Sequence, residues 1–161
     1  MRFLWFFAFS FLLISPLNAF QKEDIWKWLK SSPTVKTDKD VLIFLYNKAE
    51  CASCSGVIYR LFEAKGTAVP KSNRIILMPQ TRAVEMPVFK ERFSFLSFLP
   101  EFISDDYWYG KILGNLDLPG RSAGGFVLLN AKGEVQKIAG IKNREQIEAL
   151  IEFINSENTS Y

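Results

Sequence analysis

A chain of 161 residues, 48% hydrophobic and 15% aromatic, can build one full core, so a single domain accounts for it. Its formal net charge is only +3, with lysine and arginine scattered among acidic residues, which argues against nucleic-acid binding. Histidine is absent, which excludes histidine-assisted nucleophiles and histidine-based metal sites, and two cysteines are too few for a four-cysteine zinc site.

The N-terminus has the pattern of a secretory leader. A positive start at Met1–Arg2 precedes the apolar run Phe3–Ile14, and Ala19 is small enough for a cleavage site. We therefore expect residues 1–19 to be a signal peptide and residues 20–161 to form one exported domain, in a bacterium a periplasmic one. The alternative is an uncleaved membrane anchor, because the apolar stretch approaches the length of about 17–25 residues that spans a bilayer. Both place the domain outside the cytoplasm.

The first segment after the leader predicts an amphipathic helix over Gln21–Lys30. Ile25, Trp28 and Leu29 recur there at the helical spacing and would form its buried face, from which Trp26 is excluded. A polar connector containing Pro33 follows this helix.

The central segment joins a strand, two cysteines and a helix. Val41–Tyr46 is a continuous apolar run, too short for a helix, and predicts a buried strand. Cys51 and Cys54 follow a polar break, and apolar residues then recur at the helical period, so the cysteines open a helix. At a helix start, unpaired N–H groups and the macrodipole stabilise a thiolate, and Cys51 lies nearer that open end.

The following part predicts a second strand and an insertion. Arg74–Pro79 is another buried-strand run, which should pair parallel to the first strand. The long segment Gln80–Gly125 predicts two short helices, the second capped at Ser104. We expect its aromatic residues to be core, and the alternative is a wall beside the cysteines that grips a partner: Phe89, Phe93, Phe95, Phe98, Phe102, Tyr107, Trp108 and Tyr109.

The C-terminal part predicts a β-hairpin and a helix. Phe126–Asn130 and Glu134–Ala139 flank a three-residue turn in which Gly133 should adopt a left-handed conformation. Asn143 and Gln146 have the spacing of a helix-capping box. The buried stripe of the helix would be Ile147, Leu150, Ile151 and Ile154.

The order of strand, C-x-x-C and helix, followed by the second strand and by the hairpin and helix of residues 126–153, resembles the thioredoxin-like superfamily. The resemblance implies an α/β fold with a central mixed β-sheet flanked by helices, and with a helical insertion before the C-terminal hairpin. Members of the superfamily usually have a cis-proline just before the hairpin strand, where this chain has Gly124 and Gly125. These glycines would form the substrate-docking loop, with a trans peptide bond before Gly125.

By the same resemblance, Cys51 would attack a protein partner as a thiolate and Cys54 would resolve the mixed disulfide. This chemistry needs no cofactor and no metal, and the partner would be a protein substrate or a redox partner such as a membrane-bound electron donor. Two other interpretations stay open. One is a non-catalytic binding module with a structural Cys51–Cys54 pair, and the other is capture of a soft metal such as copper by the dithiol.

Overall fold

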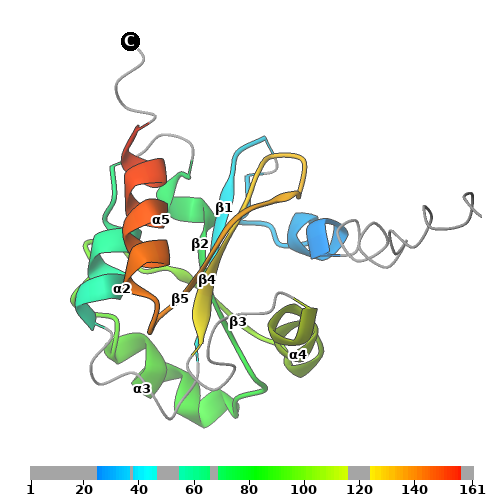
Figure 1. Cartoon of the computed structure of the whole chain (residues 1–161). Helices are drawn as coiled ribbons and strands as arrows, with labels where there is room; N and C mark the ends of the chain where they lie inside the picture. The colour runs from blue at the N-terminus through cyan, green and yellow to red at the C-terminus, as the bar shows by residue number, and fades with distance from the viewer. Residues whose placement is uncertain (1–24, 37, 47–54, 66–68, 116–123, 157–161) are drawn as a thin grey trace, which may run out of the picture.

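The computed structural model describes the chain except for residues 1–24, 37, 47–54, 66–68, 116–123 and 157–161. The expected signal peptide and both cysteines therefore lie outside the described residues. The described part forms a five-stranded mixed sheet with helices on both faces (Figure 1). Within this part, no helix has both the length and the apolar character needed to cross a membrane.

The sheet has the strand order β3-β2-β1-β4-β5. Strands β1, β2 and β3 run parallel to one another, and β4 and β5 continue the sheet in antiparallel pairing. Every residue of β1, β2 and β4 is buried, as expected for central strands covered on both faces. The bounds are β1 Val41–Leu45, β2 Arg74–Met78, β3 Glu101–Ser104, β4 Gly125–Leu129 and β5 Val135–Gly140.

The helices divide the core into two layers. Side chains alternate along a strand, so Leu42 and Phe44 of β1 point into one layer, and Ile43 and Leu45 point into the other. The first layer lies under α2, α3 and α5, whereas α4 and the helical residues 25–30 cover the second (Figure 1). The bounds are α2 Ser55–Phe62, α3 Met86–Glu91, α4 Asp106–Asn115 and α5 Arg144–Ser156.

The segment between β2 and β4 contains a strand that the sequence did not predict. β3 pairs parallel with β2 at the edge of the sheet, between the two helices that were expected. The cap of α4 also differs from the prediction by one residue. The backbone N–H of Trp108 donates to Asp105 Oδ1 at 2.9 Å, so Asp105 caps the helix. Ser104 instead bonds the preceding loop, where its hydroxyl accepts from the N–H of Thr81 at 2.7 Å.

The side chain of Trp26 is buried, which the helical pattern did not predict. Its side chain is only 7% exposed, although the spacing placed it off the buried face. The hairpin turn packs directly against it: a Cβ on Gly133 would lie 2.6 Å from the Trp26 side chain. Gly133 has a φ of 80°, which confirms the left-handed position. The turn therefore requires glycine for its backbone and also for the close approach of Trp26.

The last helix follows its pattern closely. All four residues of the predicted stripe are buried. Asn143 caps the helix, because its Oδ1 accepts from the N–H of Gln146 at 3.0 Å. The second half of the capping box is absent, since the Gln146 side chain accepts at 3.5 Å from the N–H of Gly140 in β5.

The aromatic residues of the insertion divide between the two layers. Phe89, Phe93, Phe98 and Phe102 pack into the layer of α2, and Trp108 and Tyr109 into that of α4. Most of them are therefore core or packed against core, as expected. Phe95 and Tyr107 differ from this expectation, because both are exposed, and the exposed fraction of Tyr107 is 63%.

Candidate functional site

The two predicted site cysteines belong to the connection between β1 and α2. β1 ends at Leu45 and is followed by the buried residue Tyr46, and α2 begins at Ser55, directly after Cys54 in the sequence. Residues 47–54 lie outside the described part. The surroundings of the candidate site are therefore built from the end of β1, the segment that enters β4, and the helices α2 and α3.

The two glycines of the predicted docking loop lie beside the end of β1. Gly125 is the first residue of β4, not a loop residue, and its Cα pairs with that of Leu45. Gly124 has a φ of 69°, and a Cβ there would lie 2.4 Å from the carbonyl oxygen of Leu45. Any other residue would clash with the β1 backbone, so this close approach requires glycine. The peptide bond before Gly125 is trans, as predicted, since the described residues include no cis bond.

Tyr46 forms an aromatic wall with α3 at this end of the sheet. Its ring is 5.7 Å from that of Phe89 and 5.6 Å from that of Phe93, both in edge-to-face contact. Arg92 Nη1 donates to the Tyr46 hydroxyl at 2.9 Å, which satisfies the polar end of the buried ring. The sequence placed Tyr46 in the strand and Phe89 on a helix, but their contact depends on how the insertion folds.

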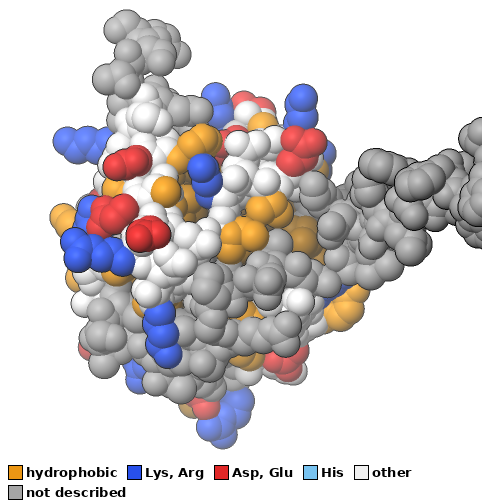
Figure 2. All heavy atoms as spheres, viewed as in Figure 1, with side chains coloured by type: hydrophobic (Ala, Val, Ile, Leu, Met, Phe, Trp, Pro, Cys, Tyr) orange, Lys and Arg blue, Asp and Glu red, His pale blue; other side chains and the backbone are white. Residues whose placement is uncertain are grey.

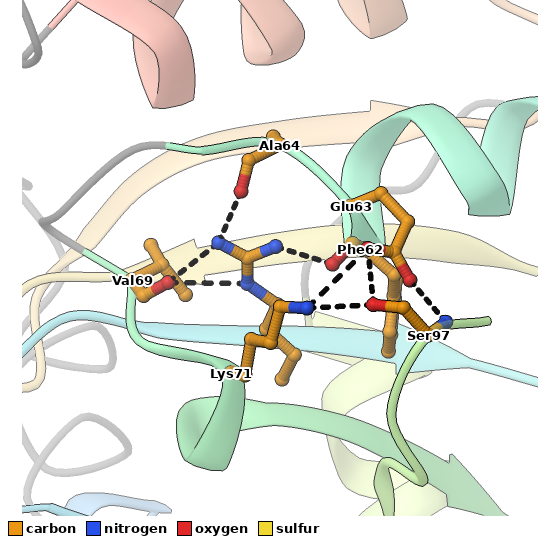
Figure 3. Close-up of polar contacts among 7 residues, drawn as sticks. Phe62, Glu63, Ala64, Val69, Lys71 and Ser97 are labelled. Carbon is orange, nitrogen blue, oxygen red and sulfur yellow. Dashed lines mark hydrogen bonds and ion pairs between the residues drawn. The ribbon is translucent and has the colours of Figure 1, made fainter.

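A buried arginine holds the C-terminal end of α2. Arg74, the first residue of β2, is only 2% exposed. Its guanidinium donates to the carbonyl of Phe62, to that of Ala64 at 2.6 Å and to that of Val69 at 2.8 and 3.1 Å. Figure 3 shows these carbonyls pointing toward one guanidinium group. The last carbonyls of a helix have no partner within it, and a cation there also complements the helix dipole.

A second polar cluster connects the same helix end to the insertion. Glu63 accepts the backbone N–H of Ser97 at 2.5 Å and its hydroxyl at 2.7 Å. Lys71 Nζ lies 3.5 Å from Glu63 Oε2 and donates to the Ser97 hydroxyl at 2.6 Å (Figure 3). Sequence analysis did not predict either cluster. Together they fix the end of α2 farthest from the cysteines, so the helix has a rigid support.

The charges of these groups respond to their surroundings. Burial lowers the pKa of Arg74 from its ordinary value to about 10, although the charge of Glu63 opposes this shift. Burial alone would raise the pKa of Glu63, but the hydrogen bonds from Ser97 and the charge of Lys71 outweigh it and lower that pKa. Arg74 therefore remains a cation and Glu63 an anion at neutral pH.

The described surface has no cluster of metal-binding side chains, and its charges are mixed. Within the described residues, no group of three or more cysteine or acidic side chains is arranged to hold a metal ion. On the face shown in Figure 2, lysine and arginine lie interspersed with aspartate and glutamate. The bidentate pair of Arg60 with Glu148, with both bonds at 2.9 Å, joins α2 to α5 on the surface.

Comparisons with known proteins show the fold. No family model and no curated protein matches the chain. A candidate protein disulfide isomerase from Bacteroides thetaiotaomicron has a TM-score of 0.50 at 15% identity, over 74% of each chain. This likeness, with the mixed sheet and flanking helices, shows that the chain has a thioredoxin-like fold.

Two further solved structures are similar at lower scores. A candidate electron transfer protein from Aquifex aeolicus VF5 has a TM-score of 0.47 at 11% identity, covering 74% of this chain and 83% of that chain. The reduced N-terminal domain of PilB from N. meningitidis has a TM-score of 0.44 at 22% identity, with the same coverage.

Proposed function

We propose that this protein is an exported thiol–disulfide exchange protein that acts on protein partners through Cys51 and Cys54. The observation that carries the proposal is the position of the C-x-x-C motif, between the end of β1 and α2 in a thioredoxin-like fold. In this proposal residues 1–19 direct the chain out of the cytoplasm, to the bacterial periplasm, where disulfide chemistry is possible.

The exchange would proceed in two balanced steps. The Cys51 thiolate attacks one sulfur of a partner disulfide, which forms a mixed disulfide and releases the other partner sulfur as a thiolate. The Cys54 thiolate then attacks Cys51 Sγ, which closes the Cys51–Cys54 disulfide and releases the second partner thiolate. Each released thiolate takes a proton from solvent. Two electrons pass from the dithiol to the partner, and the reverse sequence oxidises a partner dithiol.

The architecture around α2 supports this chemistry. The N-terminal end of a helix stabilises negative charge, so a cysteine placed there ionises more readily. The opposite end of α2 is anchored by Arg74 through the carbonyls of Phe62 and Ala64 and joined to the insertion by Glu63. A helix held at its C-terminal end keeps its N-terminal end in a constant position relative to β1 and β4.

The partner is proposed to be a protein. Gly124 and Gly125, beside the end of β1, would lie where a partner segment approaches the cysteines. A glycine pair lets another backbone come close because no side chain intervenes. The partner can be an exported cysteine protein or a membrane-bound electron donor, and both fit a domain outside the cytoplasm.

The competing interpretation is a non-catalytic binding module. Gly124 favours it, because its left-handed backbone and tight contact with Leu45 replace the usual cis-proline of the superfamily. In that case Cys51 and Cys54 would form a static bond. In the third interpretation the dithiol would instead hold a soft metal such as copper. These alternatives differ from exchange in one observable property, the formation of a covalent intermediate with a partner.

Trapping that intermediate tests the proposed function. A Cys54→Ser variant lacks the resolving thiol, so Cys51 should accumulate in mixed disulfides with partners. Non-reducing electrophoresis should separate these mixed disulfides, and a reductant should cleave them. The matched Cys51→Ser variant should trap none or far fewer. If the two variants gave equal amounts of mixed disulfide, Cys51 would not be the nucleophile. If neither trapped a partner, thiol–disulfide exchange would be the wrong function.

A further inference from the structure

An aromatic cluster lies on the face of the sheet opposite α2. Trp28, in the helical residues 25–30, stacks on Trp108 of α4 with ring centroids 5.1 Å apart and an interplanar angle of 23°. Tyr107 meets Trp108 edge to face at 5.2 Å. Both tryptophans are partly buried against the core, whereas Tyr107 is 63% exposed. The cluster therefore begins in the core and ends at the surface.

A lysine completes this group. Lys111 Nζ lies 4.8 Å from the ring centroid of Trp108 and 5.1 Å from that of Tyr107, and it donates to the Tyr107 hydroxyl at 3.0 Å. Tryptophan and tyrosine combine an apolar ring with a polar end, and lysine combines an apolar stem with a charge. Such residues are enriched where a protein meets the headgroup region of a membrane.

Core packing accounts for only part of the cluster. Ile112 and Leu29 fill the layer between α4, the helical residues 25–30 and the sheet, and both are buried. Tyr107 lies at the first turn of α4 and contributes a mostly exposed ring. An exposed ring of this size contributes little to the core, so core packing does not account for its place in the cluster.

The leader indicates what covers this surface. The apolar run Phe3–Ile14 ends eleven residues before Ile25, the first described residue of the helix that carries Trp28. Eleven residues span at most about 40 Å even when fully extended. A leader that stays in the bilayer, as in the membrane-anchor alternative, therefore keeps this helix within that distance of the membrane, and the cluster is on that helix and its neighbour α4.

The charges favour a phospholipid surface over a second copy of the chain. Lys27 and Lys30 are exposed on the helical residues 25–30, and Lys111 belongs to the cluster. The acidic neighbour Asp106 accepts the backbone N–H of Gln80 at 2.7 Å. Two copies facing each other would bring these lysines together, whereas anionic lipid headgroups attract them.

We propose that the cluster of Trp28, Tyr107, Trp108 and Lys111 rests in the headgroup region of an anionic phospholipid bilayer. This contact turns α2 and α3, on the other face of the sheet, away from the membrane (Figure 1). The C-x-x-C helix would then remain open to partners in the aqueous compartment. The inference rests on the alternative in which residues 1–19 remain as a membrane anchor, and it does not depend on the reactivity of the cysteines.

Two tyrosines of similar exposure on opposite faces provide the test. Tyr107 is 63% exposed on α4 and Tyr59 is 51% exposed on α2. The full chain, labelled with 3-fluorotyrosine, is placed in nanodiscs of phosphatidylethanolamine and phosphatidylglycerol that contain a nitroxide-headgroup lipid. Tyrosine-to-phenylalanine variants assign the ¹⁹F signals. We expect the nitroxide to broaden the Tyr107 signal several-fold more than the Tyr59 signal. Equal broadening, stronger broadening of Tyr59, or none at either residue would overturn the proposal.

A charge reversal tests the electrostatic part separately from folding. Lys111→Glu should lower the ratio of membrane-bound to membrane-free states of this face about fivefold or more. One lysine near an anionic surface strengthens binding by roughly that factor. The control Lys90→Glu, an exposed position on α3, should leave the Tyr107 broadening unchanged, and circular dichroism should match in all variants. Equal effects of the two reversals would overturn the proposal. So would a dimer in sedimentation that Tyr107→Ser disperses, since it would assign this face to a second copy.

Discussion

Replacing Arg74 by methionine removes the support at the C-terminal end of α2. The variant leaves the carbonyl oxygens of Phe62, Ala64 and Val69 without the guanidinium that donates to all three. A buried acceptor without a partner costs about 1–3 kcal/mol, so three of them cost roughly 6 kcal/mol at mid-range.

The same substitution removes an unfavourable contribution. Burial lowers the pKa of Arg74 from its ordinary value to about 10, against the opposing charge of Glu63. Since one pKa unit corresponds to about 1.4 kcal/mol, holding this cation in the interior destabilises the fold by roughly 3 kcal/mol. The net expectation for Arg74→Met is a loss of about 3 kcal/mol in the free energy of unfolding.

Urea unfolding at pH 7, followed by far-ultraviolet circular dichroism on reduced protein, measures this loss. The control is Arg60→Met, which removes an exposed guanidinium from its pair with Glu148. Exposed ion pairs contribute little, so the control should hardly change the midpoint. A loss below about 1 kcal/mol for Arg74→Met, or an equal loss in the control, would refute the reasoning.

Three other substitutions have defined outcomes. Gly124→Ala should destabilise the fold by at least about 2 kcal/mol, through left-handed strain and the clash with Leu45. Gly110→Ala has open space around it and should stabilise α4 by about 0.5–1 kcal/mol. Equal effects of the two substitutions in thermal unfolding would contradict this contrast. The folded-state pKa of Glu63 is lowered, so its contribution is complete above the ordinary value of 4.5 and is lost as pH falls through the folded value. The stability difference between wild type and Glu63→Gln should therefore shrink between pH 7 and pH 3, and a constant difference would count against the Ser97 contacts.

The sequence predicted those elements whose pattern is local and complete. β1 and β2 are unbroken apolar runs, and the stripe of α5 repeats at the helical period over four residues. β3 was missed because it is a four-residue edge strand in which two apolar residues stand between two polar ones, a pattern too short and irregular to predict a strand. Pairing with β2 makes this segment a strand, and its own sequence pattern does not reveal that pairing.

Contacts between distant segments explain the other differences. Trp26 is buried because a turn more than a hundred residues later, at Gly133, packs on it. Arg74 appeared to be the charged start of a strand, and only the approach of the end of α2 turns it into a buried anchor. The motif of the candidate site was visible in the sequence because Cys51 and Cys54 are the chain's two cysteines. The aromatic wall of Tyr46 and Phe89 required the folded insertion.

The reduction potential of the Cys51–Cys54 pair tests the proposed function most directly. The protein is equilibrated in glutathione or dithiothreitol redox buffers of known potential, and the thiols that remain are counted by alkylation and mass spectrometry. A pair that exchanges disulfides with protein partners should titrate between about −120 and −270 mV, the range of catalytic dithiols. A potential below about −300 mV would show a structural bond and would contradict thiol–disulfide exchange as the function of this protein.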